Sequence, residues 1–157
     1  MKIGIIGLRH LHPRQYARIF AVTPGVTLTA AADSDEEILR EFCGEFACKG
    51  YPDWRELLSR SDTDAVVIFL PHAECPEAAC RAAEAGKHLM VEKPMAADVA
   101  GARRIVEAAR EHGVKLSVPL VWRYHPAVLR IRDLIENDVL GRITAVEGRC
   151  AAGRPAR

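Results

Sequence analysis

Apolar positions along the chain follow two alternating patterns, one typical of buried strands and the other of amphipathic helices. Nearly continuous apolar runs, which belong in a parallel sheet covered on both faces, span residues 2–7, 26–33, 65–70, 88–94 and 115–120, and a weaker run ends at Tyr51. Between them, apolar residues recur every three to four positions, as at Ile38, Leu39 and Phe42, which is the period of a helix. The repeated units predict a doubly wound α/β fold with a parallel sheet and right-handed crossovers.

Capping residues predict where the helices begin and end. The expected starts are Pro13, Ser34 or Asp35, a capping box at 53–56, and Pro76, and the glycines expected at or just past helix ends are Gly44 and Gly86. A residue before proline is biased away from helical dihedrals. We therefore expect His12 to be non-helical and the first helix to begin late, after a long loop.

The predicted sheet places four segments on one rim, because the carboxyl ends of parallel strands face the same way. These segments follow Ile6, Ala32, Leu70 and Val91. Ligands of doubly wound sheets bind beyond this rim, where the strand order reverses.

The turn after the first strand reads GLRHLH, where a dinucleotide-binding turn normally reads G-x-G-x-x-G. Arg9 and His12 stand at the second and third glycine places. Arg9 adds bulk but offers a guanidinium that binds phosphate. One interpretation is a modified cofactor turn with binding residues Gly7, Leu8, Arg9 and His10; the other is an ordinary strand–helix turn with solvated side chains.

Acidic and basic residues follow the other strands. Asp33, about 20 residues after the first turn, is placed to accept the ribose hydroxyls of an adenosine and to repel a 2′-phosphate, which favours NAD over NADP; the alternative is a helix N-cap. Further candidate cofactor contacts are Leu70, Pro71, His72, Glu92, Lys93 and Pro94. His72 is also consistent with a merely solvated side chain. Lys93 can hydrogen-bond a substrate hydroxyl, or it is a surface lysine in a turn.

Composition restricts the class of protein further. The 157 residues suit one compact domain, and a formal net charge of +1 gives no case for a nucleic-acid partner. No apolar run approaches the roughly 20 residues that span a bilayer, and the N-terminus has no signal-peptide pattern, so a cytoplasmic protein is expected. The five cysteines, Cys43, Cys48, Cys75, Cys80 and Cys150, lack zinc-site spacing. They are interpreted as reduced thiols, and no metal site is expected.

Several motifs in fixed order resemble a known family. They are KIGIIG at the start, Asp33, DAVVIFLP at 64–71, EAGKHLMVEKPMA around residues 92–94, and HGVKLSVPLVWRYHPAVLRIRDLI followed by LGRI. From Met1 to about Val146 the chain is similar to the N-terminal half of the Gfo/Idh/MocA nicotinamide-dependent oxidoreductases. The chain departs from the family pattern at Arg9, His12, His72 and Cys75.

The resemblance implies a Rossmann domain over residues 1–120 that binds NAD(H) or NADP(H). Hydride would pass between the nicotinamide and a hydroxyl carbon of a sugar or polyol, with Lys93 as the catalytic residue. Pro94 is expected after a cis peptide.

Family members are roughly twice as long, and their second domain supplies an acid and a histidine near the substrate. Residues 121–157 match only a linker helix and the first strand of that α+β domain, expected at 143–147. The chain alone is therefore expected to be incomplete as an enzyme, and the unpaired strand edge predicts a homo-oligomer. The alternative function is a non-catalytic ligand-binding or regulatory module.

Overall fold

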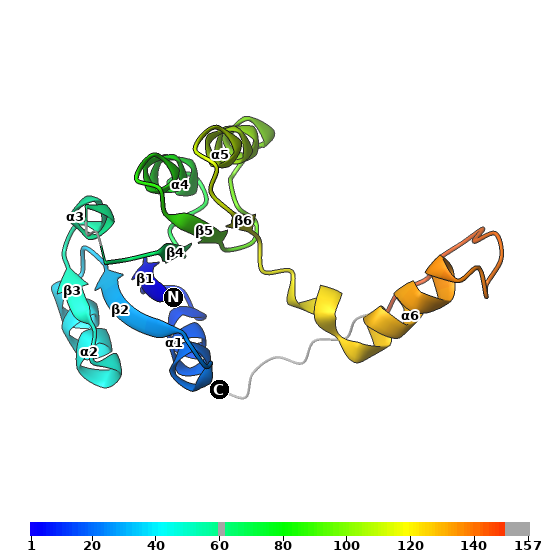
Figure 1. The fold of residues 1–157 in the computed structure, drawn as a ribbon, viewed down its shortest axis with the longest axis horizontal. Coiled ribbons are helices and arrows are strands. Elements are labelled where there is room, and N and C mark those ends of the chain that lie inside the picture. Colours follow the sequence, from blue (N-terminus) through cyan, green and yellow to red (C-terminus); the bar gives the residue numbers. More distant parts are fainter. Residues whose placement is uncertain (60–61, 150–157) are drawn as a thin grey trace. The chain divides into compact units, whose positions relative to one another are not determined.

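The computed structural model describes residues 1–59 and 62–149, and its core is a six-stranded parallel sheet (Figure 1). The strands are β1 (Lys2–Ile6), β2 (Thr27–Ala32), β3 (Lys49–Tyr51), β4 (Ala65–Ile68), β5 (His88–Val91) and β6 (Leu116–Ser117), in the order β3-β2-β1-β4-β5-β6. β1 pairs with both β2 and β4, so the strand order reverses beside it. The doubly wound fold predicted from the sequence is confirmed.

Helices cover both faces of the sheet because each central strand is apolar on both sides. The helices of this part of the chain are α1 (Pro13–Val22), α2 (Glu36–Phe46), α3 (Trp54–Leu58), α4 (Cys75–Glu84) and α5 (Val99–Glu111). Ile5 and Val67 pack with α1 and α2, whereas Ile6 and Ile68 pack with α3, α4 and α5. Each of these four strand residues is at most 3% exposed, so the apolar runs do form the buried centre of the sheet.

The start of α1 differs from the sequence prediction in one respect. α1 begins at Pro13 as expected, but His12 has helical dihedrals, with φ −86° and ψ −26°. The expectation that the following proline would exclude this conformation is wrong. Two contacts hold His12 in place: its carbonyl accepts the Tyr16 N–H at 3.0 Å, and its Nδ1 lies 3.1 Å from Glu92 Oε2.

The ends of α2 settle one open prediction and correct another. Asp35, not Ser34, is the N-cap, and its side chain accepts the N–H groups of Glu37 and Ile38. The helix continues through Gly44 and ends at Phe46. Phe46 packs against Phe42 with a ring-centroid distance of 4.7 Å, and this contact favours a further helical turn beyond the glycine.

Residues Leu120–Arg157 form a second compact unit, separate from Met1–Pro119. It contains a 3₁₀ helix (Val121–Tyr124) and α6 (Pro126–Glu136). Between residues 120 and 149, which are the described part of this unit, no strand is formed, and the strand expected at 143–147 stays a prediction. A strand needs hydrogen-bonding neighbours, and this part of the chain supplies none. The homo-oligomer predicted through that strand likewise stays a prediction.

The cysteines of the described residues are free thiols. Cys75 is fully buried, and the Sγ atoms of Cys43 and Cys48 lie 3.6 Å apart. Cys150 lies outside the described residues. Among residues 1–59 and 62–149, no helix is long and apolar enough to cross a bilayer.

Candidate functional site

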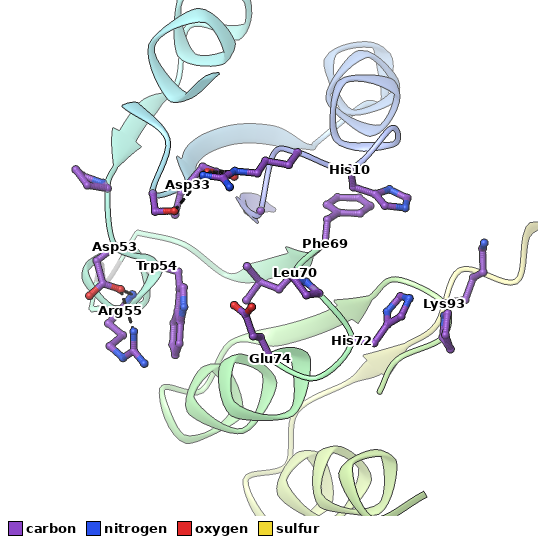
Figure 2. Close-up of a pocket in the computed structure, with 17 residues that line it drawn as sticks. His10, Asp33, Asp53, Trp54, Arg55, Phe69, Leu70, His72, Glu74 and Lys93 are labelled. Carbon is purple, nitrogen blue, oxygen red and sulfur yellow. Dashed lines mark hydrogen bonds and ion pairs between the residues drawn. The ribbon is translucent and has the colours of Figure 1, made fainter. Parts of the chain in front are cut away.

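A cavity of about 700 Å³ opens along the carboxyl ends of the strands (Figure 2). Its walls come from the segments that follow β1, β2, β3, β4 and β5. Figure 2 shows Asp53 and Trp54 at one end, His72 and Lys93 at the other, and Leu70 between them. The cavity therefore suits an elongated ligand that crosses the point where the strand order reverses.

Nine of the eleven residues singled out in the sequence line this cavity: Gly7, Arg9, His10, Asp33, Leu70, Pro71, His72, Lys93 and Pro94. The other two lie behind its wall. Leu8 is buried, and only its backbone N–H is directed at a cavity residue, Asp33. Glu92 is 3% exposed and contacts His12.

Gly7 makes the tight turn that brings the backbone to the cavity. Its φ is +86°, and a Cβ added there would lie 2.9 Å from the carbonyl carbon of Phe69. Its N–H donates to the carbonyl of Ala32 at 2.9 Å. Both the dihedral angle and the close approach to the start of the β4–α4 loop require glycine at this position.

Asp33 links the first two strand ends. Its Oδ2 accepts the Leu8 N–H at 2.7 Å, and its Oδ1 accepts the Asp35 N–H at 2.9 Å. The side chain is 6% exposed, and Arg9 Nε lies 3.4 Å from Oδ1. The alternative that Asp33 caps a helix is wrong because Asp35 has that role.

Arg9 covers the end of β2. Its Nη2 lies 3.5 Å from Ser34 Oγ and 3.8 Å from Asp35 Oδ2. The side chain is 62% exposed, so water screens these ion pairs. The guanidinium and the Ser34 hydroxyl thus form a group of hydrogen-bond donors beside the Asp33 carboxylate.

At the opposite end of the cavity, His10 and His72 approach Lys93. The ring of His10 stacks on Phe69 with a centroid distance of 5.8 Å and an interplanar angle of 13°. Burial lowers the pKa of His10, and the neighbouring His12, Lys93 and His72 lower it further, against a smaller opposing effect of Glu92. The peptide bond between Lys93 and Pro94 is cis, as expected from the family pattern.

The sequence analysis missed the residues that follow β3. Asp53, Trp54 and Arg55 line the cavity, and the Arg55 guanidinium lies 4.1 Å from the centroid of the Trp54 ring. Phe69, Ser34, Pro52, Ala32 and Glu74 also lie on the wall. The available signal was positional: once β3 is placed next to β2, residues after Tyr51 share the rim with Asp33.

Comparison with known proteins identifies the family. Residues 1–120 match the model of the Gfo/Idh/MocA oxidoreductase family, described as its NAD-binding Rossmann fold. This chain belongs to that family. Residues 1–120 form the NAD-binding Rossmann domain of this oxidoreductase family.

Individual relatives agree with this assignment. The chain is 34% identical over 149 residues to a dTDP-3,4-didehydro-2,6-dideoxy-alpha-D-glucose 3-reductase of Streptomyces violaceoruber, covering 93% of this chain and 43% of the relative. The chain therefore spans less than half the length of this relative.

Two similar solved structures contain nicotinamide cofactors. The WlbA dehydrogenase of Bordetella pertussis, in complex with NADH and UDP-GlcNAcA, superposes with a TM-score of 0.84 at 25% identity, over 90% of this chain and 43% of that one. The 3-ketoreductase KijD10 of Actinomadura kijaniata, in complex with NADP and TDP-benzene, superposes with a TM-score of 0.80 at 29% identity, over 88% of this chain and 43% of that one. Both forms of the cofactor thus occur among its relatives.

Proposed function

We propose that this chain binds NAD(H) along the cavity and forms the cofactor-binding half of a dehydrogenase of sugars or polyols. The observation that carries the proposal is the meeting of Gly7, Asp33 and Lys93 on one cavity wall, although each follows a different strand. A tight glycine turn at the pyrophosphate and an acid at the ribose are the features by which a doubly wound sheet binds a dinucleotide. Lys93 lies at the far end of the cavity, where a substrate would meet the nicotinamide.

The adenosine end of the cofactor is assigned to the side of Asp33 and Trp54. The Asp33 carboxylate would accept the ribose hydroxyls, and the stacked side chains of Trp54 and Arg55 would flank the adenine. Because the Leu8 N–H already donates to Asp33, the pyrophosphate contacts are assigned to His10 and the turn at Gly7. Arg9, beside Asp33 and Ser34, is assigned to the ribose side of the cofactor.

The nicotinamide end is assigned to Leu70, Pro71, His72 and Lys93, with Glu92 and Pro94 fixing the lysine in place. Bound NAD(H) supplies the hydride acceptor or donor. Lys93 would hold the substrate hydroxyl by hydrogen bonding and orient its carbon toward that ring. Lys93 is exposed, so a drier pocket would need walls from outside residues 1–119.

NAD(H) is proposed as the preferred cofactor over NADP(H). A buried carboxylate such as Asp33, with 6% of its side chain exposed, repels a 2′-phosphate placed next to it. The Arg9 guanidinium would attract a 2′-phosphate, but its ion pairs with Asp33 and Asp35 offset part of its charge. We place the protein in the cytoplasm, because the cysteines of the described residues are free thiols.

A non-catalytic ligand-binding or regulatory module is the second candidate. The exposure of Lys93 favours it, because general acid–base catalysis works best where water is excluded.

Titration of the purified chain with NADH, followed by cofactor fluorescence and thermal unfolding, tests the proposal. At 100 times its Kd, the cofactor should raise the free energy of unfolding by roughly 2.7 kcal/mol. Asp33→Ala should weaken NADH binding and narrow the difference in affinity between NADH and NADPH. Lys93→Met should change the affinity for NADH by no more than about threefold, because Lys93 borders the nicotinamide with three other residues and its main proposed role is to hold the substrate hydroxyl.

No shift in unfolding temperature at millimolar NADH or NADPH would overturn the proposal. Binding without hydride transfer to any sugar or polyol, also when the matching C-terminal half of a relative is added, would instead favour the binding module.

A further inference from the structure

Three side chains with metal-ligating atoms converge behind the wall of the cavity. His10 and His12 lie on the loop between β1 and α1, and Glu92 follows β5 directly. One ligand atom from each of the three lies within 4.8 Å of the others. The loop and the strand end are distant in sequence, and the reversal of strand order beside β1 brings them together.

The tightest part of this cluster is the pair of His12 and Glu92. The Glu92 side chain is 4% exposed, and its Oε2 lies 3.1 Å from His12 Nδ1. The ring of His10 meets the ring of His12 edge-on, with centroids 4.5 Å apart. A nearly buried carboxylate therefore faces two imidazoles, one of which, His10, reaches the solvent-filled cavity.

We propose that His10, His12 and Glu92 form a binding site for a divalent transition-metal cation of the Zn²⁺ type. Two imidazoles and one carboxylate are a ligand set of open metal sites, in which a fourth position stays available to water or substrate. Cysteine spacing carries no signal for this site, because its ligands are two histidines and a glutamate.

The geometry requires a small adjustment on binding. With metal–nitrogen and metal–oxygen bonds of about 2.0–2.2 Å, tetrahedral ligand atoms lie roughly 3.3 Å apart. The His12–Glu92 distance already fits, and the widest separation of ligand atoms must contract by at most roughly 1.5 Å. His10 is exposed and can rotate. Ligation through its Nδ1 replaces the 3.2 Å hydrogen bond that this atom accepts from the His12 N–H.

Neighbouring charges limit the affinity of the site. The Lys93 ammonium acts electrostatically on His10 and opposes a metal cation there, while the charge of the Glu92 carboxylate favours it. Because His10 also lines the cavity, a bound ion would lie at the cavity wall on the side of Lys93. The proposal goes beyond the cofactor site and does not depend on NAD(H) binding.

Metal titration of the whole chain, stripped of metal with EDTA and kept reduced, tests the site. Zn²⁺ binding is measured by calorimetry, and Co²⁺ binding by the absorption of its d–d bands. We expect one ion per chain, with Co²⁺ bands free of the strong near-ultraviolet absorption that thiolate ligands produce. His12→Ala and Glu92→Gln should weaken binding by at least about 100-fold, and His10→Ala by at least about tenfold.

His112→Ala is the matched control, since it removes a histidine from the end of α5 and should leave the affinity unchanged. Because His10 is exposed, His10→Ala provides a test that does not disturb the core. Absence of binding by the wild-type chain, or equal affinity in the wild type and the folded His10→Ala and His12→Ala variants, would overturn the proposal. Loss of binding in Cys48→Ala would also overturn it by assigning the ion to the thiols.

Discussion

The backbone N–H of Leu8 donates a hydrogen bond of 2.7 Å to the Asp33 carboxylate, and this bond joins the segments that follow β1 and β2 at the cavity wall. Asp33 is therefore a structural residue as well as a candidate ribose ligand. Its side chain is nearly buried, so loss of the carboxylate leaves the Leu8 N–H without its acceptor.

Asp33→Ala should lower the free energy of unfolding by about 1.5–3 kcal/mol, the range for a hydrogen bond to a charged group. Urea unfolding measures the change. Asp35→Ala is the matched control, because it removes an exposed N-cap at a cost of about 1 kcal/mol. If Asp33→Ala proves no more costly than Asp35→Ala, the Leu8–Asp33 bond does not stabilise the turn.

Gly7→Ala should destabilise the protein more than Gly25→Ala does. Both glycines have positive φ, +86° and +76°, so each substitution carries a conformational cost of roughly 1–2 kcal/mol. Only at Gly7 does the new Cβ meet backbone, 2.9 Å from Phe69, whereas nothing lies within 4 Å at Gly25. Chemical denaturation of the two variants isolates this close approach. Equal losses would show that the turn relaxes to admit a methyl group.

The arrangement of the cavity wall was predictable from the sequence because it depends on strong local signals and one topological rule. The apolar runs of β1 and β4 identify central strands, and parallel strands direct their carboxyl ends to one rim. Asp33, His72 and Lys93 follow such runs, so the sequence alone predicts that they lie on the same rim of the sheet.

Other parts depend on long-range relationships that local patterns do not carry. Trp54 and Arg55 follow β3, a strand of three residues, so their place at the rim is visible only when the strand order is known. The contact of His12 with Glu92 joins residues 80 positions apart. Conversely, residues 143–147 have the local pattern of a strand, but described residues 120–149 contain no partner strand.

Arg9→Ala should weaken NADPH binding at least about tenfold and NADH binding by less than about threefold. The guanidinium lies beside Asp33 and Ser34, where a 2′-phosphate would be, and a lost charge-assisted contact corresponds to about 1.5–3 kcal/mol. Fluorescence titrations with both cofactors at two salt concentrations measure the change.

Ser34→Ala is the control for that experiment, since it removes the neighbouring hydroxyl without changing charge. Its effect on NADPH binding should be smaller than that of Arg9→Ala, and it should leave the salt dependence intact. Tighter binding of both cofactors to the Arg9→Ala variant would show that Arg9 obstructs the turn instead of binding phosphate.

Stability should fall as pH rises from about 9 towards 12, and Cys48 should account for part of the slope. Burial, together with the charge and hydrogen bond of Cys43, raises the pKa of Cys48 to about 12, whereas an unfolded thiol titrates near 8.5. Between these values the unfolded chain releases the Cys48 proton and the folded chain retains it. The free energy of unfolding therefore decreases by up to about 1.4 kcal/mol per pH unit for this group.

Urea unfolding of the wild type and Cys48→Ala at pH 8, 9 and 10 measures this contribution, since lysine and tyrosine titration affects both proteins equally. We expect the stability advantage of the wild type to shrink steadily above pH 9. Cys80→Ala is the comparison, because burial raises the pKa of Cys80 as well but no second thiol adds to the effect. The stability advantage of the wild type over Cys80→Ala should therefore shrink less than its advantage over Cys48→Ala. Parallel stability curves for the wild type and Cys48→Ala would show that the Cys48 thiol ionises as readily in the folded protein as in the unfolded chain.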